Sequence, residues 1–192
     1  MSRPPGRPRS EESKQAILEA AYALLKKRGI GKVSTQELAA AAGVSTATLY
    51  RWWKSKEAIM LDAFFEHVKP ALSFEEARSP LERLRLNVVR GASWLQSEDG
   101  RVAVRLISDV HEEPKLRRLF LEHFYLPRRA IHLRLVQDAI AAGELRNDTD
   151  ADVLVDALFG PLYFRFLIGH AAVDKAFATK LVNQVLKAVM AR

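Results

Sequence analysis

Two short capped segments on either side of a glycine constrain the fold of this chain more than any other feature. Ser34 and Glu37 have the S-x-x-E spacing of a capping box, which opens a helix by satisfying its first backbone N–H groups. Gly43 ends that helix within about two turns. Ser45 is placed to cap the next helix, which runs through TATLYRWW. The segment therefore predicts two short helices joined by a tight turn.

The spacing between these helices is that of a helix-turn-helix. Ala39 is small enough for two helices to cross, Gly43 can take positive φ in the turn, and Leu49 is an apolar anchor. An ordinary helical hairpin is the alternative that spacing alone leaves open. On the second helix Trp53 shares the inward face with Leu49, whereas Trp52 lies at the edge of the exposed face, where its indole N–H can reach a phosphate oxygen. Burial of Trp52 in a larger interface is the competing interpretation. The exposed face is predicted to hold Thr46, Ala47, Tyr50 and Arg51.

Helix signals continue on both sides of this pair. Ser10 is placed to cap a first helix, whose end is predicted at Gly29 with Ile30 as the hydrophobic residue of the C-terminal cap. Ser55 can cap a further helix, KEAIMLDAFFEHV. No alternating strand pattern separates these caps, so the chain is predicted to be all-α. The apolar positions Ile17, Ala21, Leu24 and Leu25 share one face of the first helix.

The positive charge of the chain is concentrated in its first third. The 192 residues carry a net charge of +7. Residues 1–60 hold 11 Lys or Arg against 5 Asp or Glu, whereas residues 61–192 hold 19 against 18. This asymmetry favours polyanion binding by the N-terminal part, and a solvated basic helix face is the alternative.

The stretch STQELAAAAGVSTATLYRWWKSKEAIMLDAF resembles the DNA-binding domain of the TetR/AcrR family of bacterial transcriptional regulators. The likeness covers roughly residues 10–65 and includes the capped helix, the glycine turn, the recognition helix and the Lys-Glu pair after it. Trp53 stands where the family usually has phenylalanine. The resemblance implies that base edges lie near Thr46, Ala47 and Thr48 beside the Ser45 cap, and that phosphates are held by Thr35, Tyr50, Trp52 and Lys56.

Elementary chemistry agrees with several of these roles. Thr35 and Lys56 lie near helix N-termini, where free N–H groups and the helix dipole favour an anionic phosphate. The methyl groups of Thr46 and Ala47 suit contact with thymine methyls, and Arg51 can bond guanine or phosphate. Before the first helix, Gly6-Arg7-Pro8 resembles the core of an AT-hook without the arginine before its glycine. Arg7 is therefore a candidate for the minor groove, against the alternative of a basic tail that adds only counterion release.

Beyond residue 66 the helical pattern belongs to a different region. VKPALSFEEARSP is predicted to be a helix-breaking link, and Pro127 is predicted to break or kink a later helix. In DVLVDALFGPLYFRFLIG the apolar residues surround most of the helix, so it must bury a partner side as well as a core side. This closing portion resembles the C-terminal ligand-binding and dimerisation region of one TetR subgroup. We expect a dimer interface at Leu158, Leu162, Leu181 and Val185, and effector contacts at Trp94, Phe120, His123, Phe124, Tyr125, Tyr163 and Phe166.

Other functional classes lack their motifs. The chain has no cysteine, no phosphate-binding G-x-x-x-x-G-K-[ST], no G-x-S-x-G, and no H-E-x-x-H, because position 115 is Lys. We therefore expect no enzyme activity, no metal and no cofactor. A signal peptide and a membrane-spanning stretch are not predicted, so we expect a soluble cytoplasmic protein.

The sequence thus predicts an all-α chain with a basic flexible arm (1–9), a three-helix helix-turn-helix DNA-binding domain (10–66) and a helical effector-binding and dimerisation domain (67–192). The expected function is a homodimeric transcriptional regulator, a repressor, that binds a palindromic double-stranded DNA operator and is released by a small apolar or aromatic effector. One alternative is a helical small-molecule-binding protein whose N-terminal helices contact other proteins. A second is an architectural DNA-binding protein with little sequence preference.

Overall fold

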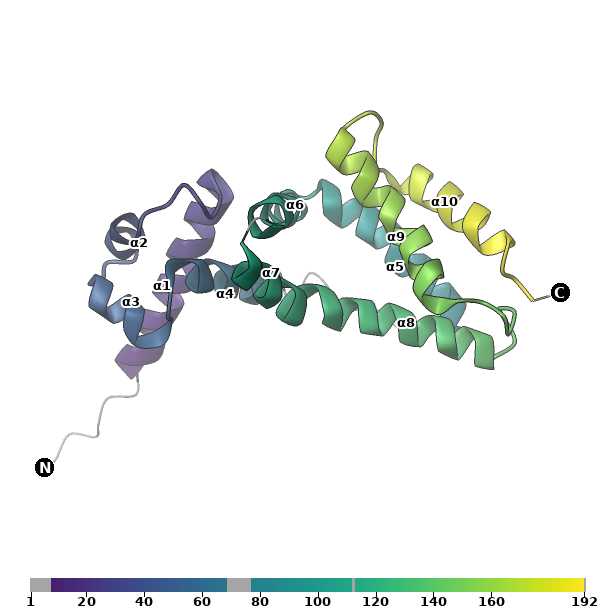
Figure 1. Ribbon diagram of the computed structural model, residues 1–192, viewed down its shortest axis with the longest axis horizontal. Helices are drawn as coiled ribbons and strands as arrows, with labels where there is room; N and C mark the ends of the chain where they lie inside the picture. Colours follow the sequence, from purple (N-terminus) through teal and green to yellow (C-terminus); the bar gives the residue numbers. More distant parts are fainter. Residues whose placement is uncertain (1–7, 69–76, 112, 192) are drawn as a thin grey trace, which may run out of the picture. The chain divides into compact units, whose positions relative to one another are not determined.

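The computed structural model describes residues 8–68, 77–111 and 113–191, and within these ranges it contains helices and no named strand. The all-α prediction is therefore confirmed. One isolated antiparallel bridge joins Leu145 and Met190. The elements are α1 (Pro8–Arg28), α2 (Thr35–Ala41), α3 (Thr46–Trp52), α4 (Lys56–Val68), α5 (Pro80–Gln96), α6 (Glu98–His111), α7 (Pro114–Phe120), the π-helical turn η2 (Leu121–Tyr125), α8 (Leu126–Ala141), α9 (Ala151–Ile168) and α10 (Lys175–Lys187) (Figure 1).

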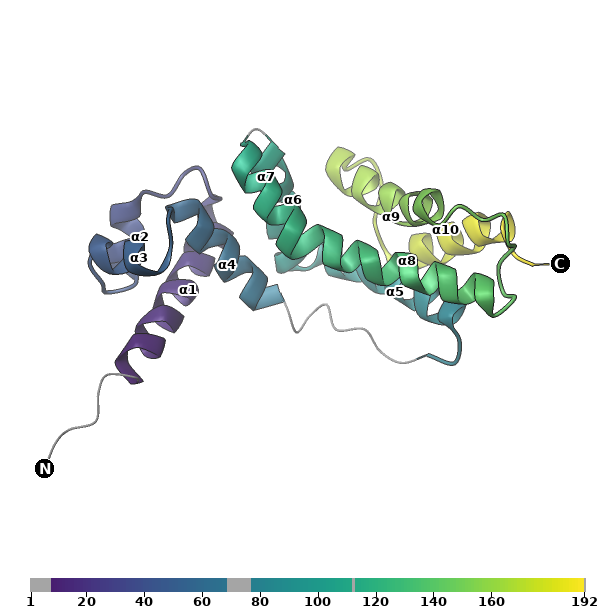
Figure 2. The same cartoon turned by 60° about the horizontal axis from the view of Figure 1, so that its bottom comes forward.

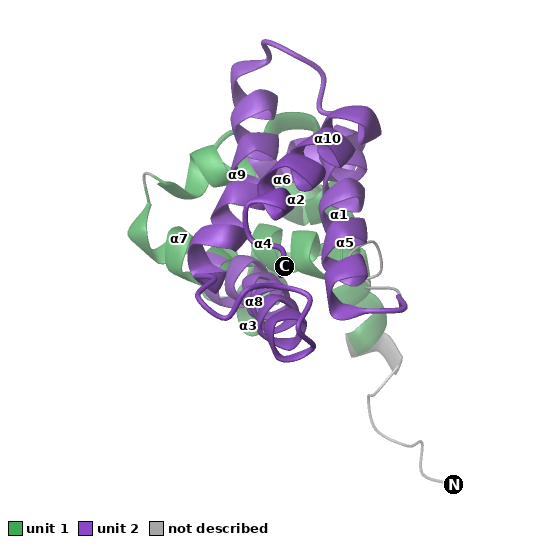
Figure 3. Ribbon diagram, turned by 90° about the vertical axis from the view of Figure 1, so that its right-hand side faces the viewer, with its two compact units in different colours: residues 1–72, 105–120 green, residues 73–104, 121–192 purple. Residues whose placement is uncertain are grey.

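The chain divides into two compact units, coloured separately in Figure 3. The first contains residues 1–72 and 105–120, and the second contains residues 73–104 and 121–192. Residues 105–109 are tied to the end of α1, because the Asp109 carboxylate accepts a hydrogen bond from the Ile30 N–H at 3.3 Å. The Arg105 guanidinium also donates to the Lys26 carbonyl at 3.3 Å. The first unit therefore contains the C-terminal part of α6 and the whole of α7 in addition to the N-terminal helices α1 to α4.

The predicted caps of the helix-turn-helix are present. Ser34 accepts from the Glu37 N–H while the Glu37 carboxylate accepts from the Ser34 N–H, which completes the capping box. Gly43 has φ of +65°, and the Val44 N–H bonds the Ala39 carbonyl in a Schellman cap. Ser45 and Ser55 cap α3 and α4 through bonds from the Thr48 and Ala58 N–H groups.

The start of α1 differs from the prediction. The helix begins at Pro8, so Ser10 lies inside its first turn and is not its N-cap. Proline is favoured at this position because it lacks the N–H that a helix start leaves unpaired. The end is as predicted: α1 stops at Arg28, Gly29 has φ of +82°, and Ile30 is buried.

The core of the first unit is formed by the inward faces of α1 to α4 (Figure 2). Leu49 and Trp53 are both buried, as their shared helix face predicted. The Trp53 indole Nε1 donates to Asp62 Oδ2 at 2.7 Å, which links the end of α3 to α4. Tyr22 of α1 stacks on His67 of α4, with ring centroids 3.7 Å apart. These contacts fix the inward face of α3 against the other helices of the unit and leave its outward face exposed to solvent.

The second unit is a bundle in which α5 contacts α8, α9 and α10 (Figures 1 and 2). The α5 and α8 helices run antiparallel. Leu81, at the start of α5, donates its N–H to the carboxylate of Glu144, just beyond the end of α8. Trp94, near the end of α5, contacts Phe124, just before α8. The buried side chains of this bundle include Leu84, Val88, Leu95, Val136, Ala139, Val155, Leu158, Leu162, Val182 and Leu186.

Pro127 does not end the helical path between α7 and α8. The five-residue segment Leu121–Tyr125 forms a π-helical turn, and Pro127 lies in the first turn of α8, which follows it. In a regular α-helix the proline ring clashes with the carbonyl four residues earlier, and a widened turn ahead of the proline relieves that clash. The predicted break or kink is thus a π-turn. Such turns are frequent at functional sites.

The corner between α5 and α6 leaves no room for a side chain at Gly100. A Cβ built on Gly100 would overlap the carbonyl oxygen of Trp94 and the backbone of Leu95. The Ser97 hydroxyl and the Ser97 N–H both donate to that same Trp94 carbonyl, at 2.6 and 2.9 Å. Main-chain contact therefore fixes the end of α5 against the start of α6 within the second unit.

Candidate functional site

The α3 helix presents a small, polar face to solvent. Thr46, Ala47 and Arg51 are exposed, Tyr50 is half exposed, and Leu49 on the opposite side is buried. Because side chains at i and i+4 share a helix face, this division follows from the order of residues in TATLYRW. The exposed face is the one for which the sequence predicted DNA contacts.

Two of the predicted phosphate ligands lie together although they come from different helices. The Thr35 hydroxyl of α2 and the Tyr50 hydroxyl of α3 are 3.1 Å apart, at hydrogen-bond distance. At the start of α3, the Ser45 and Thr48 hydroxyls are 2.9 Å apart, and Ser45 also accepts from the Thr48 N–H. Thr48 is therefore partly engaged in capping its own helix.

The start of α2 is anchored to the end of α1 by charge. The Glu37 carboxylate accepts from the Ser34 N–H at 2.8 Å and from the Arg28 guanidinium at 2.5 Å. The hydrogen bonds from Ser34 and Arg28 lower the pKa of Glu37 to about 2. The carboxylate is thus ionised at all ordinary pH values, and it keeps the two helix ends together.

Trp52 is flanked by cations, but its indole nitrogen does not face solvent. The Arg51 guanidinium and the Lys14 ammonium lie 5.7 and 5.9 Å from the ring centroid. The Trp52 Nε1 is buried and has no hydrogen-bond partner among the described residues. The predicted phosphate bond from this N–H is not supported by the geometry. It is Trp53, predicted to be a core residue only, that uses its indole N–H, in the bond to Asp62.

Lys56 has an intramolecular role that the sequence did not indicate. Its ammonium donates to the Val33 carbonyl at 2.6 Å and lies 3.3 Å from the Glu57 carboxylate. Only 16% of its side chain is exposed. Lys56 therefore joins the start of α4 to the loop that precedes α2. Arg7, predicted to enter the minor groove, lies outside the described residues.

The second unit brings together part of the predicted effector set. The rings of Trp94 and Phe124 lie 6.2 Å apart, and the Arg128 guanidinium covers Phe124 at 3.9 Å from its centroid. Tyr163 of α9 packs against the same hydrophobic core as Trp94. We name Trp94, Phe124, Arg128 and Tyr163 the Arg128 cluster. Its members come from the end of α5, the π-turn, the start of α8 and α9.

Other members of the predicted effector set lie elsewhere. His123 and Tyr125 are exposed, because they flank the buried Phe124 in the π-turn and point away from it. Phe120 is buried but belongs to the first unit. Phe166 is half-buried and packs against the hydrophobic core of the second unit.

The sequence interpretation missed several residues of this region. Arg128 and His132 follow Phe124 at intervals of four, so all three share one face of the helical path. His132 stacks on Phe159 of α9 with ring centroids 4.2 Å apart. Asn87 of α5 is only 6% exposed. The four-residue spacing of an aromatic, an arginine and a histidine was the available signal.

Burial alters the acid–base chemistry of these groups. Burial lowers the pKa of Arg128 to about 10, so the guanidinium remains charged at neutral pH. Burial, aided by the positive charge of Arg129, lowers the pKa of His132 to about 4. Burial also raises the pKa of Tyr163. At neutral pH Arg128 is therefore positively charged, whereas the imidazole of His132 and the phenol of Tyr163 are neutral.

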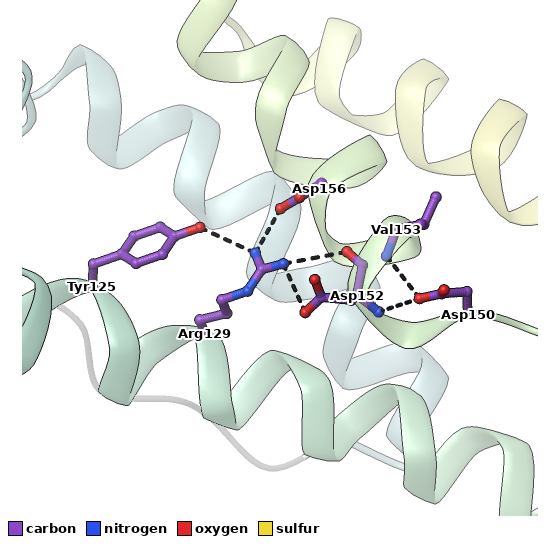
Figure 4. A network of polar contacts seen from close by, with 6 residues as sticks. All are labelled: Tyr125, Arg129, Asp150, Asp152, Val153 and Asp156. Atoms are coloured by element: carbon purple, nitrogen blue, oxygen red, sulfur yellow. Dashed lines mark hydrogen bonds and ion pairs between the residues drawn. The ribbon is translucent and has the colours of Figure 1, made fainter.

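Arg129 has a different environment from its neighbour Arg128 (Figure 4). Its guanidinium lies 2.6 Å from an Asp156 oxygen and 2.9 Å from an Asp152 oxygen, both on α9. The Tyr125 hydroxyl accepts a further bond at 3.1 Å. These partners raise the pKa of Arg129 and tie the start of α8 to the first turns of α9.

The predicted dimer residues on α9 must be corrected. Leu158 and Leu162 are fully buried in the core of their own unit and are not available to a partner. They face inward because the four-residue repeat that includes Leu154 packs against α5. On α10, Leu181 and Val185 are half-buried against the same core. The outward apolar face of α9 instead holds Val153, Ala157, Gly160, Phe164, Leu167 and Ile168, of which Phe164 is 59% exposed.

Within the described residues, none of the helices has the length and apolar character required to cross a lipid bilayer.

Comparison with known proteins relates both units to one family. A model of the bacterial regulatory proteins of the tetR family matches residues 17–63, and a tetracyclin repressor-like C-terminal domain matches residues 76–185. The HTH-type transcriptional regulator YdeS of Bacillus subtilis (strain 168) is 34% identical over 186 residues, which span 97% of this chain and 94% of YdeS.

Solved structures agree with this relationship. The TetR family transcription regulator SCO0332 has a TM-score of 0.74 at 32% identity, covering 93% of this chain and 98% of SCO0332. The flavonoid-responsive regulator FrrA shares the fold, with a TM-score of 0.72 at 24% identity over 95% of this chain and 99% of FrrA. This chain belongs to the TetR family of DNA-binding transcriptional regulators, which are not enzymes.

Proposed function

We propose that this protein is a repressor that binds a palindromic operator as a homodimer and is released by a small apolar or aromatic effector. The observation that carries the proposal is the division of α3 into a buried side and an exposed side of small polar residues. A helix that offers Thr46, Ala47 and Arg51 to solvent can approach base edges in a major groove closely. The basic charge of residues 1–60 adds attraction for phosphates.

We propose separate roles for the residues on this face. Thr46 and Ala47 contact thymine methyls or base edges, and Arg51 contacts guanine or phosphate. The paired hydroxyls of Thr35 and Tyr50 can donate to one phosphate group, because they lie 3.1 Å apart on neighbouring helices. Lys56, already bonded to Val33, supports the loop before α2.

The dimer in this proposal forms through the outward face of α9. Four exposed large apolar residues, Val153, Phe164, Leu167 and Ile168, lie on this face and leave it without a covering element within the described chain. Apolar stripes of this kind favour a two-fold contact in which the same surface of both copies meets. Two recognition helices on such a dimer reach half-sites about 34 to 36 Å apart, or a multiple of that distance.

Effector control requires a difference in affinity between two states of the dimer. An effector that prefers the state with wrongly spaced recognition helices by about 1 to 3 kcal/mol changes operator affinity by roughly 5- to 150-fold. Linkage then requires operator DNA to weaken effector binding by the same factor. FrrA, which shares this fold, is described as flavonoid-responsive.

Selection of DNA fragments by the purified protein tests the proposal. Sequencing the retained fragments is expected to give an inverted repeat with the half-site spacing above. Thr46→Val is expected to change base preference, whereas Tyr50→Phe is expected to weaken all sequences similarly. The exposed Lys180 on α10 provides a charge control, and Lys180→Ala is expected to leave binding unchanged. Failure to retain any duplex over random competitor at about 50 mM salt, where phosphate contacts are strong, would reject the proposal.

A further inference from the structure

Two adjacent arginines at the start of α8 have opposite environments. Arg129 is bonded to two aspartates and a tyrosine (Figure 4). Arg128 instead stacks on Phe124, which lies beside Trp94 of α5, and no carboxylate of the described residues is bonded to it. A charged guanidinium in a half-buried position ordinarily has an anionic partner, because burial without one is costly.

The donors of Arg128 are largely unused. One Nη donates to the Phe124 carbonyl at 2.7 Å, and the guanidinium plane stacks on the Phe124 ring. The Nε atom is buried and has no hydrogen-bond partner in the described chain. Stacking on Phe124 fixes the plane of the guanidinium and therefore the direction of its remaining N–H groups.

A second unsatisfied donor belongs to the same cluster. The Trp94 Nε1 is buried without a hydrogen-bond partner in the parts of the chain that are described, and its ring contacts Phe124. Two turns earlier on α5, the side-chain nitrogen of the buried Asn87 is also unpaired within the described residues. Buried N–H groups are nearly always satisfied in native proteins, so these unpaired nitrogens are candidates to donate to a bound acceptor.

The surroundings of these donors are aromatic. Phe124 lies under Arg128, Trp94 lies beside Phe124, and Tyr163 of α9 packs against the same hydrophobic core as Trp94. One turn after Arg128, the neutral His132 stacks on Phe159 of α9. A few donors among aromatic rings are the features of a site for a small molecule with an apolar body and one polar end.

We propose that the Arg128 cluster binds an aromatic or aliphatic carboxylate, with the carboxylate on the Arg128 guanidinium and the Trp94 indole N–H and the apolar body among the surrounding rings. This inference rests on the proposed function, since it specifies the chemistry of the effector. A carboxylate suits the site because it only accepts hydrogen bonds and matches the planar fork of a guanidinium. A neutral amide of the same shape cannot supply the missing charge.

Calorimetry on the full chain without DNA tests this chemistry. The probes are naphthalene-2-carboxylate and decanoate, each compared with its own primary amide. Each carboxylate that binds is expected to do so at least tenfold more tightly than its amide, since charge-assisted bonds are about twice as strong as neutral ones. Arg128→Met is expected to abolish this preference. Arg129→Met, which removes the neighbouring arginine that already has carboxylate partners, is expected to retain it.

The same variants give a readout that needs no probe. Arg128→Met removes a buried charge without an anionic partner, so the ligand-free variant is expected to unfold at a higher temperature than the unmodified protein. Arg129→Met breaks an ion-pair network and is expected to unfold at a lower temperature. Far-ultraviolet circular dichroism confirms that each variant is folded before binding is measured.

Three outcomes would overturn the proposal. These are equal affinity for each carboxylate and its amide, a preference that survives in Arg128→Met, or the absence of binding by both carboxylates at millimolar concentration. Operator binding is measured separately on the same protein by DNA selection. Loss of the carboxylate preference with intact operator binding rejects only the effector chemistry, whereas loss of operator binding in the unmodified protein rejects the proposed function.

Discussion

Replacement of Lys56 by alanine distinguishes a structural lysine from a DNA-binding one. The Lys56 ammonium donates to the carbonyl of Val33, a residue that is almost fully buried. Hydrogen bonds that involve a charged group contribute about 1.5 to 3 kcal/mol to stability. Because 16% of the Lys56 side chain is exposed and water can replace part of the bond, we expect the lower half of this range, about 1.5 to 2 kcal/mol.

A chain of this size changes its unfolding temperature by about 2 to 4 °C per kcal/mol. Lys56→Ala is therefore expected to lower the unfolding temperature of the protein by roughly 3 to 8 °C, measured by circular dichroism. Lys54→Ala, at an exposed position two residues away, is the matched control and is expected to change it little. Lys56→Met, which keeps most of the side-chain stem, separates packing from the lost hydrogen bond.

The salt dependence of operator binding completes this test. If the ammonium is committed to Val33, Lys56→Ala leaves the slope of affinity against salt unchanged apart from any loss of folded protein. A slope lowered by about one unit, with an unchanged unfolding temperature, would show that Lys56 neutralises a phosphate and would refute the structural role.

Three further predictions concern other parts of the structure. Phe164→Glu, on the exposed face of α9, is expected to give folded monomers by light scattering, whereas Leu158→Glu is expected to unfold the second unit; a dimeric Phe164→Glu would place the interface elsewhere. Since burial lowers the pKa of His132 from 6.5 to about 4, the folded state binds fewer protons than the unfolded state between these values. The free energy of unfolding of the second unit therefore loses nothing to His132 above about pH 6.5 and falls by up to roughly 3 kcal/mol as the pH is lowered to 4. In urea unfolding, His132→Gln is expected to show a smaller fall over this pH range than the unmodified protein. An equal fall in both proteins would contradict this. Trp53→Phe removes the bond to Asp62 and part of a buried ring, so its cost in urea unfolding is expected to be about 1 to 3 kcal/mol, mostly from lost packing because water can rehydrate the exposed Asp62, and a loss below about 0.5 kcal/mol would contradict this.

Local signals predicted the caps of α2, α3 and α4 because these helix ends are encoded locally. The hydroxyl of Ser34, the carboxylate of Glu37 and the glycine at 43 act on backbone groups only a few residues away. The inward direction of Leu49 and Trp53 follows from the helix repeat alone. The bond from Lys56 to Val33 could not be predicted in this way, since it joins residues 23 positions apart and depends on how α4 packs.

The second unit was predicted less completely because its helix faces are ambiguous. Apolar residues surround α9, so the sequence did not distinguish the buried Leu158 from the exposed Phe164. Packing against α5 makes that choice. Arg128 was likewise overlooked because arginine is usually a surface residue, and only the fold shows that it lies over Phe124 beside α5.

The absence of space at Gly100 limits how the second unit can rearrange. With the Trp94 carbonyl pressed against Gly100 and bonded twice by Ser97, the end of α5 cannot slide along its axis relative to the start of α6. Any movement of α5 relative to the start of α6 must therefore be a rotation about this corner. Its displacement is smallest at Trp94 and grows towards Pro80, at the opposite end of the helix.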